Sequence, residues 1–267
     1  MDHVDEDVDL KRKVIVVIIP DDACVPRNNV IRYLFSNPMF NIIDVKPKVG
    51  NNVDTPGLTS DQYFEICAVR DGLLAARNLD PLAACIIIKD TSTSASDPST
   101  VANIVSKSLA VDCFDLCYLC KWLDMCQLYT DVGHDTKNDK ISLMKTKSPH
   151  GIQAILFSVQ GRDIVLGTRT MANGQHFIIN NSLDVRLSHE IFNCNISAIC
   201  TVPNVIDYDI AFNASSNSDF IKANECVPVT GPQQPIPNSE GNIVGFILIV
   251  SLILLVAWAF LRCGPRR

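Results

Sequence analysis

The chain has 267 residues, of which 47% are hydrophobic and 19% charged, and its formal net charge is −6. This length admits one sizeable domain, or one domain with an appendage, because single hydrophobic cores stop growing at about 250–300 residues. The sequence has no basic stripe that would contact phosphates, so we expect no nucleic acid as a partner.

Apolar runs rich in β-branched residues alternate with amphipathic segments along most of the chain. Such runs predict buried strands, and apolar residues at helical spacing predict helices that pack by one face. The elements expected in chain order are a strand over 13–20, a helix over 28–35, a strand over 40–49, a helix over 62–79, a strand over 83–90, a helix over 99–112, a strand over 114–123, a strand running into a helix over 151–167, and a strand over 196–204.

Capping residues support two of the expected helices. Ser60 with Asp61 offers an N-cap for the helix over 62–79, and Ser96 or Asp97 offers one for the next helix, with Pro98 in its first turn. Strands that alternate with amphipathic helices indicate a largely parallel sheet covered on both faces. The class is therefore α/β, with one domain over residues 13–226.

The two ends of the chain differ from this body. An acidic tail over 1–12 precedes it, and a Pro-rich segment over 227–242 follows as an extended linker. Residues 243–261 form an apolar stretch without a charge, long enough for one transmembrane helix, and a basic tail over 262–267 comes directly after it.

No signal peptide is evident at the N-terminus, so we expect a single-pass, tail-anchored membrane protein whose main domain is cytosolic. The terminal arginines favour the opposite topology, because positive residues tend to stay in the cytosol. The chain has 11 cysteines, which suit the cytosol if they are reduced thiols. A zinc site at Cys113, Cys117, Cys120 and Cys126 is the alternative, but their spacing lacks paired C-x-x-C knuckles.

Ligands of open α/β sheets collect beyond the carboxyl ends of the strands, so the residues after each apolar run are the candidate site residues. The chain contains no G-x-G-x-x-G, no Walker loop and no G-x-S-x-G elbow. No motif in the sequence therefore indicates dinucleotide binding, P-loop phosphoryl transfer or a hydrolase nucleophile.

Several segments, in order and spacing, resemble the sugar-nucleotide-dependent glycosyltransferases of family 25, the lipooligosaccharide and procollagen galactosyltransferase group. They are "VIVVIIPDDACVPR", "EICAVRDGLLAARNLD", "CIIIKDTS", "FDLCYL", "SPHGIQAILFSVQGRDIVL" and "NSLDVRLSH". The resemblance implies a glycosyltransferase A-like, Rossmann-like mixed sheet with helices on both faces. It also implies a UDP-sugar and Mn²⁺ as ligands of an active member.

The resemblance assigns four candidate site residues. Asp90 stands where the family has an apolar strand ending in Glu-Asp-Asp, and it is the candidate metal ligand. Asp184 stands where a later segment of the family carries an aspartate. Asp90 and Asp184 are the two catalytic candidates. Arg27 and Lys121 are the candidates for binding the diphosphate. Each also has a plainer interpretation: a strand-ending or helix-starting acid, and a solvated cation.

This sequence departs from the family at the metal motif. Lys89 and Thr91 flank Asp90 where acids are expected, and Arg70-Asp71 replaces a Ser-His pair on the preceding helix. A lone carboxylate beside a cation is a poor site for a divalent metal, which usually has several oxygen ligands. We therefore expect no cofactor and a non-catalytic role.

Two functions follow from these features. The first is a membrane-anchored scaffold that binds other structural proteins, for example as a minor capsid or virion membrane protein of a large DNA virus, located at the virion inner membrane. The second is a working galactosyl- or glucosyltransferase that binds its UDP-sugar donor with Arg27 or Lys121 and without a metal.

Overall fold

The computed structural model describes residues 13–21, 26–48, 57–132 and 141–208. The chain divides into two compact units, Met1–Val227 and Pro228–Arg267, and all described residues belong to the first. The expected tails, linker and transmembrane helix over 243–261 lie outside the described residues. Within the described ranges, none of the helices is both long and apolar enough to cross a bilayer.

An eight-stranded mixed sheet forms the centre of the domain, in the order β2-β1-β3-β8-β5-β9-β7-β6. Its strands β1, β2, β3, β5 and β9 run parallel to one another, and β8 and β7 run against their neighbours. The bounds are β1 Val14–Ile19, β2 Phe40–Asp44, β3 Cys85–Lys89, β5 Leu116–Cys120, β6 Thr130–Asp131, β7 Ser142–Lys145, β8 Ala154–Phe157 and β9 Ala198–Val202.

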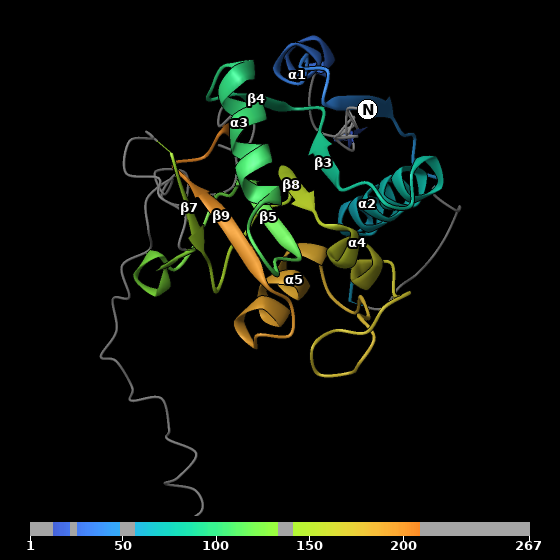
Figure 1. Cartoon of the computed structure of the whole chain (residues 1–267). Coiled ribbons are helices and arrows are strands. Elements are labelled where there is room, and N and C mark those ends of the chain that lie inside the picture. The colour runs from blue at the N-terminus through green and yellow to red at the C-terminus, as the bar shows by residue number, and fades with distance from the viewer. Residues whose placement is uncertain (1–12, 22–25, 49–56, 133–140, 209–267) are drawn as a thin grey trace, which may run out of the picture. The chain divides into compact units, whose positions relative to one another are not determined.

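Helices cover both faces of this sheet (Figure 1). One core cluster joins α1 and α3 to one face, and a second joins α2, α4 and α5 to the other. The bounds are α1 Asn28–Leu34, α2 Ser60–Leu79, α3 Pro98–Leu109, α4 Val159–Val165 and α5 Leu183–Phe192, with a short 3-10 helix at Cys126–Leu128.

Alternation along the central strands explains why both faces are buried. In β1, Val16 lies in the core with α1 and α3, while Val17 lies in the core with α2. Apolar residues are also aligned between neighbouring strands. Val16 is in register with Ile42 of β2 and with Ile86 of β3. Strands that are apolar on both faces require helices on both faces, and this confirms the expected layers.

The α/β class and the mixed sheet are confirmed. The sequence pattern did not predict β6, β7, α5 or a second, smaller sheet. A second sheet pairs β4 (Ser92–Ser94) with β10 (Ile206–Tyr208) in an antiparallel ladder. The segment after Asp90 is rich in hydroxyl side chains and lies between the expected strand over 83–90 and the expected helix over 99–112. It forms a strand because Tyr208 and its neighbours, far along the chain, supply the hydrogen-bonding partner.

The described cysteines are mostly free thiols, and Cys117 and Cys120 are buried within β5. Cys126 is the exception, because it is disulfide-bonded. The condition under which the cysteines suit the cytosol, that they are reduced thiols, is therefore not met at Cys126. No group of three or more metal-ligating side chains occurs among the described residues, so the alternative of a zinc site finds no support there.

Candidate functional site

Asp90 lies at the carboxyl end of β3, where both its side chain and its backbone carbonyl accept hydrogen bonds from other segments. The side chain is buried, and its Oδ1 accepts a hydrogen bond of 2.9 Å from the backbone N–H of Asp21, just after β1. The Asp90 carbonyl accepts a further bond of 2.6 Å from the backbone N–H of Arg27. Asp90 therefore joins the ends of β1 and β3 to the start of α1.

Lys89 places a positive charge among the acids at this edge of the sheet. Its Nζ donates to Glu65 Oε2 at 2.6 Å and lies 4.0 Å from Asp21 Oδ2. All three side chains line a cavity of about 520 Å³ together with Asp61 and Gln62, from the first turn of α2. Lys89 is only 13% exposed, so its charge is balanced by protein carboxylates more than by water.

Burial controls the protonation of these acids. It raises the pKa of Glu65 most, the neighbouring Lys89 lowers it, and the charges of Asp184 and Asp21 raise it further. Burial likewise raises the pKa of Asp90, and the hydrogen bond from the Asp21 amide opposes this effect.

Asp184 stands in the first turn of α5 and holds a histidine. Its Oδ1 accepts a bond of 2.6 Å from the Gly151 backbone N–H, and its Oδ2 lies 3.2 Å from Nδ1 of His150. The other ring nitrogen, Nε2, lies 3.1 Å from the Ser188 hydroxyl, one turn further along α5. The hydrogen bond to Asp184 raises the pKa of His150 and burial opposes this shift.

The hydrogen-bonded series Asp184–His150–Ser188 has the residue types of a nucleophilic triad, but its serine is not in the environment of a nucleophile. Ser188 is buried and also lies 3.1 Å from the Ser148 hydroxyl. A nucleophile must reach a substrate carbonyl, and a buried serine within a helix does not. We interpret these hydrogen-bonded side chains as a structural connection that holds the segment around His150 against α5.

The two predicted diphosphate cations follow different strands and have different contacts. Arg27 caps α1 with its backbone beside Asp90, at the edge where a nucleotide would lie. Lys121 follows β5, and its Nζ donates to the Thr201 carbonyl at 2.9 Å and lies 5.8 Å from the Tyr129 ring centroid. The ammonium of Lys121 is thus engaged by the end of β9.

Sequence reasoning missed Asp21, Glu65 and the role of His150. Asp21 directly follows the first strand, so its position was a usable signal. Glu65 and His150 gave no signal, because only the tertiary structure brings Glu65 to Lys89 and His150 to Asp184.

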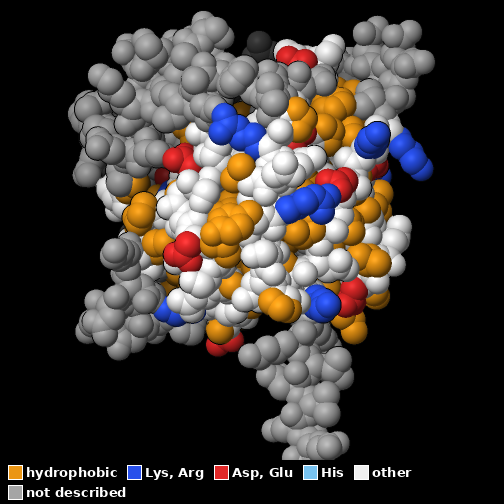
Figure 2. Space-filling model, turned by 90° about the horizontal axis from the view of Figure 1, so that it is seen from above, with side chains coloured by type: hydrophobic (Ala, Val, Ile, Leu, Met, Phe, Trp, Pro, Cys, Tyr) orange, Lys and Arg blue, Asp and Glu red, His pale blue; other side chains and the backbone are white. Residues whose placement is uncertain are grey.

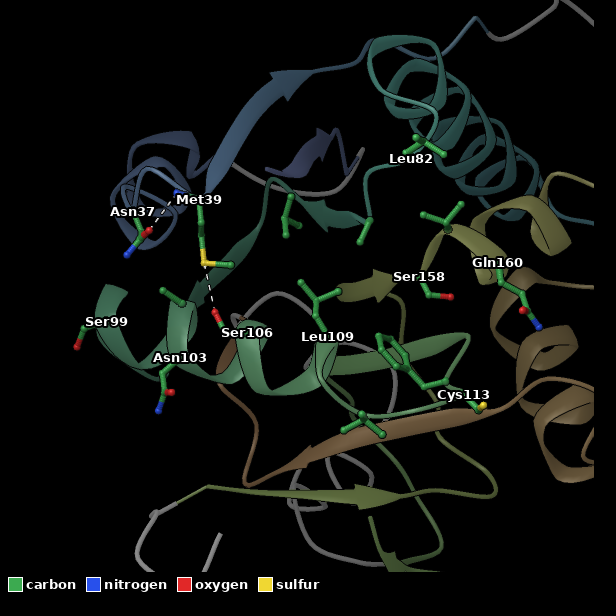
Figure 3. A pocket seen from close by; sticks show the side chains of 16 residues that line it. Asn37, Met39, Leu82, Ser99, Asn103, Ser106, Leu109, Cys113, Ser158 and Gln160 are labelled. Atoms are coloured by element: carbon green, nitrogen blue, oxygen red, sulfur yellow. Dashed lines mark hydrogen bonds between the residues drawn. The ribbon is translucent and has the colours of Figure 1, made fainter. Parts of the chain in front are cut away.

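A second cavity, of about 1120 Å³, lies at the opposite edge of the sheet, where β1, β3 and β5 begin. Figure 3 shows Asn37 and Met39 on one side of it and Ser99, Asn103 and Ser106 of α3 on another. None of its described lining residues is charged. It therefore offers no counter-charge to a diphosphate, unlike the edge that carries Lys89.

Charged side chains are also dispersed on the face shown in Figure 2. There, Lys, Arg, Asp and Glu form small separate groups among uncharged and apolar atoms of the described residues. The described part of this face has no continuous basic area.

Comparisons with known proteins give structural similarities only. Neither a family model nor a curated protein sequence matches the chain. The crystal structure of A197 from STIV is similar over 70% of this chain and 81% of its own, with 9% identity and a TM-score of 0.36. Apo-UDP-glucose pyrophosphorylase is similar over 74% of both chains, with 9% identity and a TM-score of 0.32. No residue role is taken from either structure.

Proposed function

We propose that this chain is a glycosyltransferase-like domain that has lost metal-dependent catalysis and serves as a membrane-anchored structural component. The observation that carries the proposal is the position of Lys89, whose ammonium lies 2.6 Å from Glu65 and 4.0 Å from Asp21. Both carboxylates thus face an ammonium group, and among the described residues no third acid completes a metal-binding group with them.

The electrostatics favour the ammonium over a metal ion. A divalent cation at ~4 Å from Lys89 would be repelled by about 1 to 4 kcal/mol for each of its charges, depending on the effective dielectric. It would also have to displace an ion pair that is already largely dehydrated. Asp90 adds little, since one of its oxygens accepts the Asp21 amide and its side chain is only 6% exposed.

The architecture supports the same proposal. The mixed sheet with helices on both faces is the arrangement that the resemblance to family 25 glycosyltransferases implies. Within it, Asp90 directly follows β3 and precedes β4 of the small β4–β10 sheet. The structural role rests on the apolar stretch over 243–261, which would tether the domain to a membrane, such as the inner membrane of a virion, beside protein partners.

The position of Lys89 also favours a second candidate, a sugar transferase that uses no metal. An ammonium in a cavity can neutralise the charge that develops on a departing diphosphate. In this case Lys89, with Arg27 nearby on the same edge, would bind the diphosphate of a UDP-sugar. Asp184 or His150 would then be the candidate base toward an acceptor hydroxyl.

A thermal-shift series separates the two candidates. The wild-type chain and its Lys89→Met and Asp90→Asn variants are heated with UDP-galactose or UDP-glucose, with and without Mn²⁺. The proposal predicts no stabilisation of the wild type by any combination, because the cation site is occupied by Lys89. Lys145→Met is the matched control, since Lys145 is exposed on β7.

Two outcomes would overturn the first candidate. Stabilisation of the wild type that requires Mn²⁺ would show a working metal site. Stabilisation by a UDP-sugar without Mn²⁺, lost in Lys89→Met but kept in Lys145→Met, would establish the metal-free transferase in its place.

A further inference from the structure

The uncharged cavity of about 1120 Å³, at the edge of the sheet where β1, β3 and β5 begin, has no part in the proposed function. Ten of its sixteen lining residues are apolar, and the other six carry an amide or a hydroxyl group. Small-molecule sites have this composition, with mostly apolar walls and a few hydrogen-bonding groups. The cavity therefore has the lining of a ligand site.

Helix α3 forms one wall along the cavity. Five of its residues line the cavity and recur at helical spacing: Ser99, Ala102, Asn103, Ser106 and Leu109. The wall from Ser99 to Leu109 is about 15 Å long, because a helix rises about 1.5 Å per residue. The cavity is thus elongated, and it suits a ligand that is long and narrow.

Polar groups with unused hydrogen-bonding capacity lie at one end of the cavity, where Figure 3 shows Asn37, Asn103 and Ser106. The Asn37 Oδ1 accepts the Met39 backbone N–H at 3.0 Å, so its amide nitrogen is left to donate. The Asn103 side chain has no hydrogen bond among the described residues, and the Ser106 hydroxyl reaches only the Met39 sulfur, at 3.8 Å. Since sulfur is a weak acceptor, two amides and a hydroxyl are available to a ligand here.

Apolar side chains line the cavity beyond this end. Figure 3 shows Leu109 and Leu82 further along it, and Cys113 further still. Val14 and Phe114 also line it and are buried, whereas Leu82 and Leu109 are exposed. A hydrocarbon chain that lies along these side chains is removed from water, which favours its binding.

The cavity offers no counter-charge to a charged ligand. Lys13 and Asp112 each precede a lining residue in the chain, but both are exposed, neither lines the cavity, and their charges are opposite. A charged group bound here would lose hydration and gain no partner of opposite charge. We therefore expect the polar end of the ligand to be neutral.

We propose that this cavity binds an uncharged amphiphile with one hydrocarbon chain and a hydroxyl-bearing head, the chemistry of a monoacylglycerol. The head is bound by the amides of Asn37 and Asn103, and the chain runs past Leu109 toward Cys113. The cavity lies at the edge of the sheet opposite Lys89. The inference therefore involves no sugar and no nucleotide, and it does not rest on the proposed function.

The recessed lining favours such a ligand over a protein partner. Among the large apolar side chains that line the cavity, Leu82 and Leu109 are exposed, and the others are buried or half-buried. A stable protein interface buries about 800 Å² on each partner and has an extended apolar core. A narrow hydrocarbon chain can reach recessed side chains that a broad protein surface leaves uncovered.

Cys113 provides a chemical reporter of the site. Cys113 and Cys194 are both exposed free thiols, with φ of 61° and 59°, and of the two only Cys113 lines the cavity. The full chain in phospholipid nanodiscs is treated with N-ethylmaleimide, and alkylation of each cysteine is followed by peptide mass spectrometry. We expect monodecanoylglycerol at about ten times its Kd to slow alkylation of Cys113 about tenfold, and to leave Cys194 unchanged.

Two further compounds test the chain and the head of the ligand separately. Glycerol has the hydroxyls without the hydrocarbon chain, and it should give no protection of Cys113. Decanoate has the same chain with a charged head, and it should need a concentration about tenfold higher for equal protection.

A matched pair of variants tests the wall of the cavity. Leu109→Gln and Leu79→Gln each replace an exposed leucine at the last position of a helix, and of the two only Leu109 lines the cavity. Leu109→Gln should weaken binding about tenfold, and Leu79→Gln should leave it unchanged. Cross-linking by a monoacylglycerol with a diazirine in its chain measures binding without Cys113, and circular dichroism confirms that each variant is folded.

Four results would overturn the inference. The first is that neither protection of Cys113 nor cross-linking to the lining residues occurs. The second is equal protection by decanoate and monodecanoylglycerol, and the third is undiminished binding by Leu109→Gln. The fourth is faster alkylation of Cys113, without ligand, in a chain that lacks residues 1–12, which would make those residues the occupant of the cavity.

Discussion

Gly151 determines the geometry around Asp184 and Trp122. Its N–H donates to Asp184, its φ of +112° is open to glycine only, and its Cα hydrogens face the indole. Any side chain at this position meets both a strained backbone and the Trp122 ring. Gly151 therefore connects Asp184, the predicted catalytic acid, with Trp122, which the sequence did not indicate as a functional residue.

Replacing Gly151 should be costly. We expect Gly151→Ala to lower the free energy of unfolding by about 3 kcal/mol, through backbone strain and the clash with Trp122. Urea unfolding followed by circular dichroism measures this. Gly174→Ala is the control, because Gly174 also has positive φ but open space around its Cβ, so it should cost about 1 kcal/mol. Equal losses in the two variants would show that the Trp122 contact adds nothing.

The pair of His150 and Asp184 predicts a pH dependence. The hydrogen bond to Asp184 raises the pKa of His150 above its ordinary 6.5 in the folded state. A group with a raised folded pKa stabilises the protein below its unfolded pKa, and this contribution is lost as the pH rises through the folded pKa. The stability difference between wild type and His150→Gln should thus be larger at about pH 6 than at about pH 9. A difference that grows with pH would contradict the assignment.

At the scale of secondary-structure elements, Arg162 connects α4 to the end of α2. It is fully buried and donates to the carbonyls of Pro81 at 2.6 Å and Ala83 at 3.0 Å, and its Nε donates to Asp163 at 3.1 Å. These carbonyls lie in the turn between α2 and β3. Among the described residues, no other donor is seen on the carbonyls of Pro81 and Ala83, so Arg162 satisfies these acceptors.

Removing this arginine should loosen that junction. Arg162→Met should lower the free energy of unfolding by about 3 kcal/mol, because buried carbonyls and Asp163 lose a charged donor. Arg77→Met is the matched control: Arg77 lies 3.9 Å from the same Asp163 but is 37% exposed, so its loss should cost less than about 1 kcal/mol. Denaturant titration of both variants gives the comparison.

Local sequence patterns predicted which segments form helices and strands, but they did not predict which segments pair with one another. The helix expected over 62–79 occurs at Ser60–Leu79, but Thr59 is its cap, because Thr59 and Gln62 form a reciprocal capping box. Asp97 caps α3 as one of the two expected candidates. The strand expected over 114–123 is shorter, at Leu116–Cys120, since Trp122 and Leu123 turn away to pair with His150.

At the scale of the whole molecule, the chain divides into two compact units after Val227. The domain boundary expected at 226 stays a prediction. We expect a chain ending at residue 226 to unfold cooperatively and to remain in the soluble fraction of a cell lysate. The full chain should sediment with membranes, because 243–261 is apolar enough to insert. Fractionation with and without alkaline carbonate measures this. Release of the full chain by carbonate would contradict membrane insertion.

The sequence by itself determined the α/β class, most helices and strands, and the isolation of Asp90 among non-acidic neighbours. These depend on periodicity, caps and residue order, which act over a few residues. Only the tertiary structure decided that Glu65 and Asp21 meet Lys89, that His150 meets Asp184, and that β4 pairs with β10. Such contacts join residues tens of positions apart, and they form only after strand order and helix packing bring one edge of the sheet together.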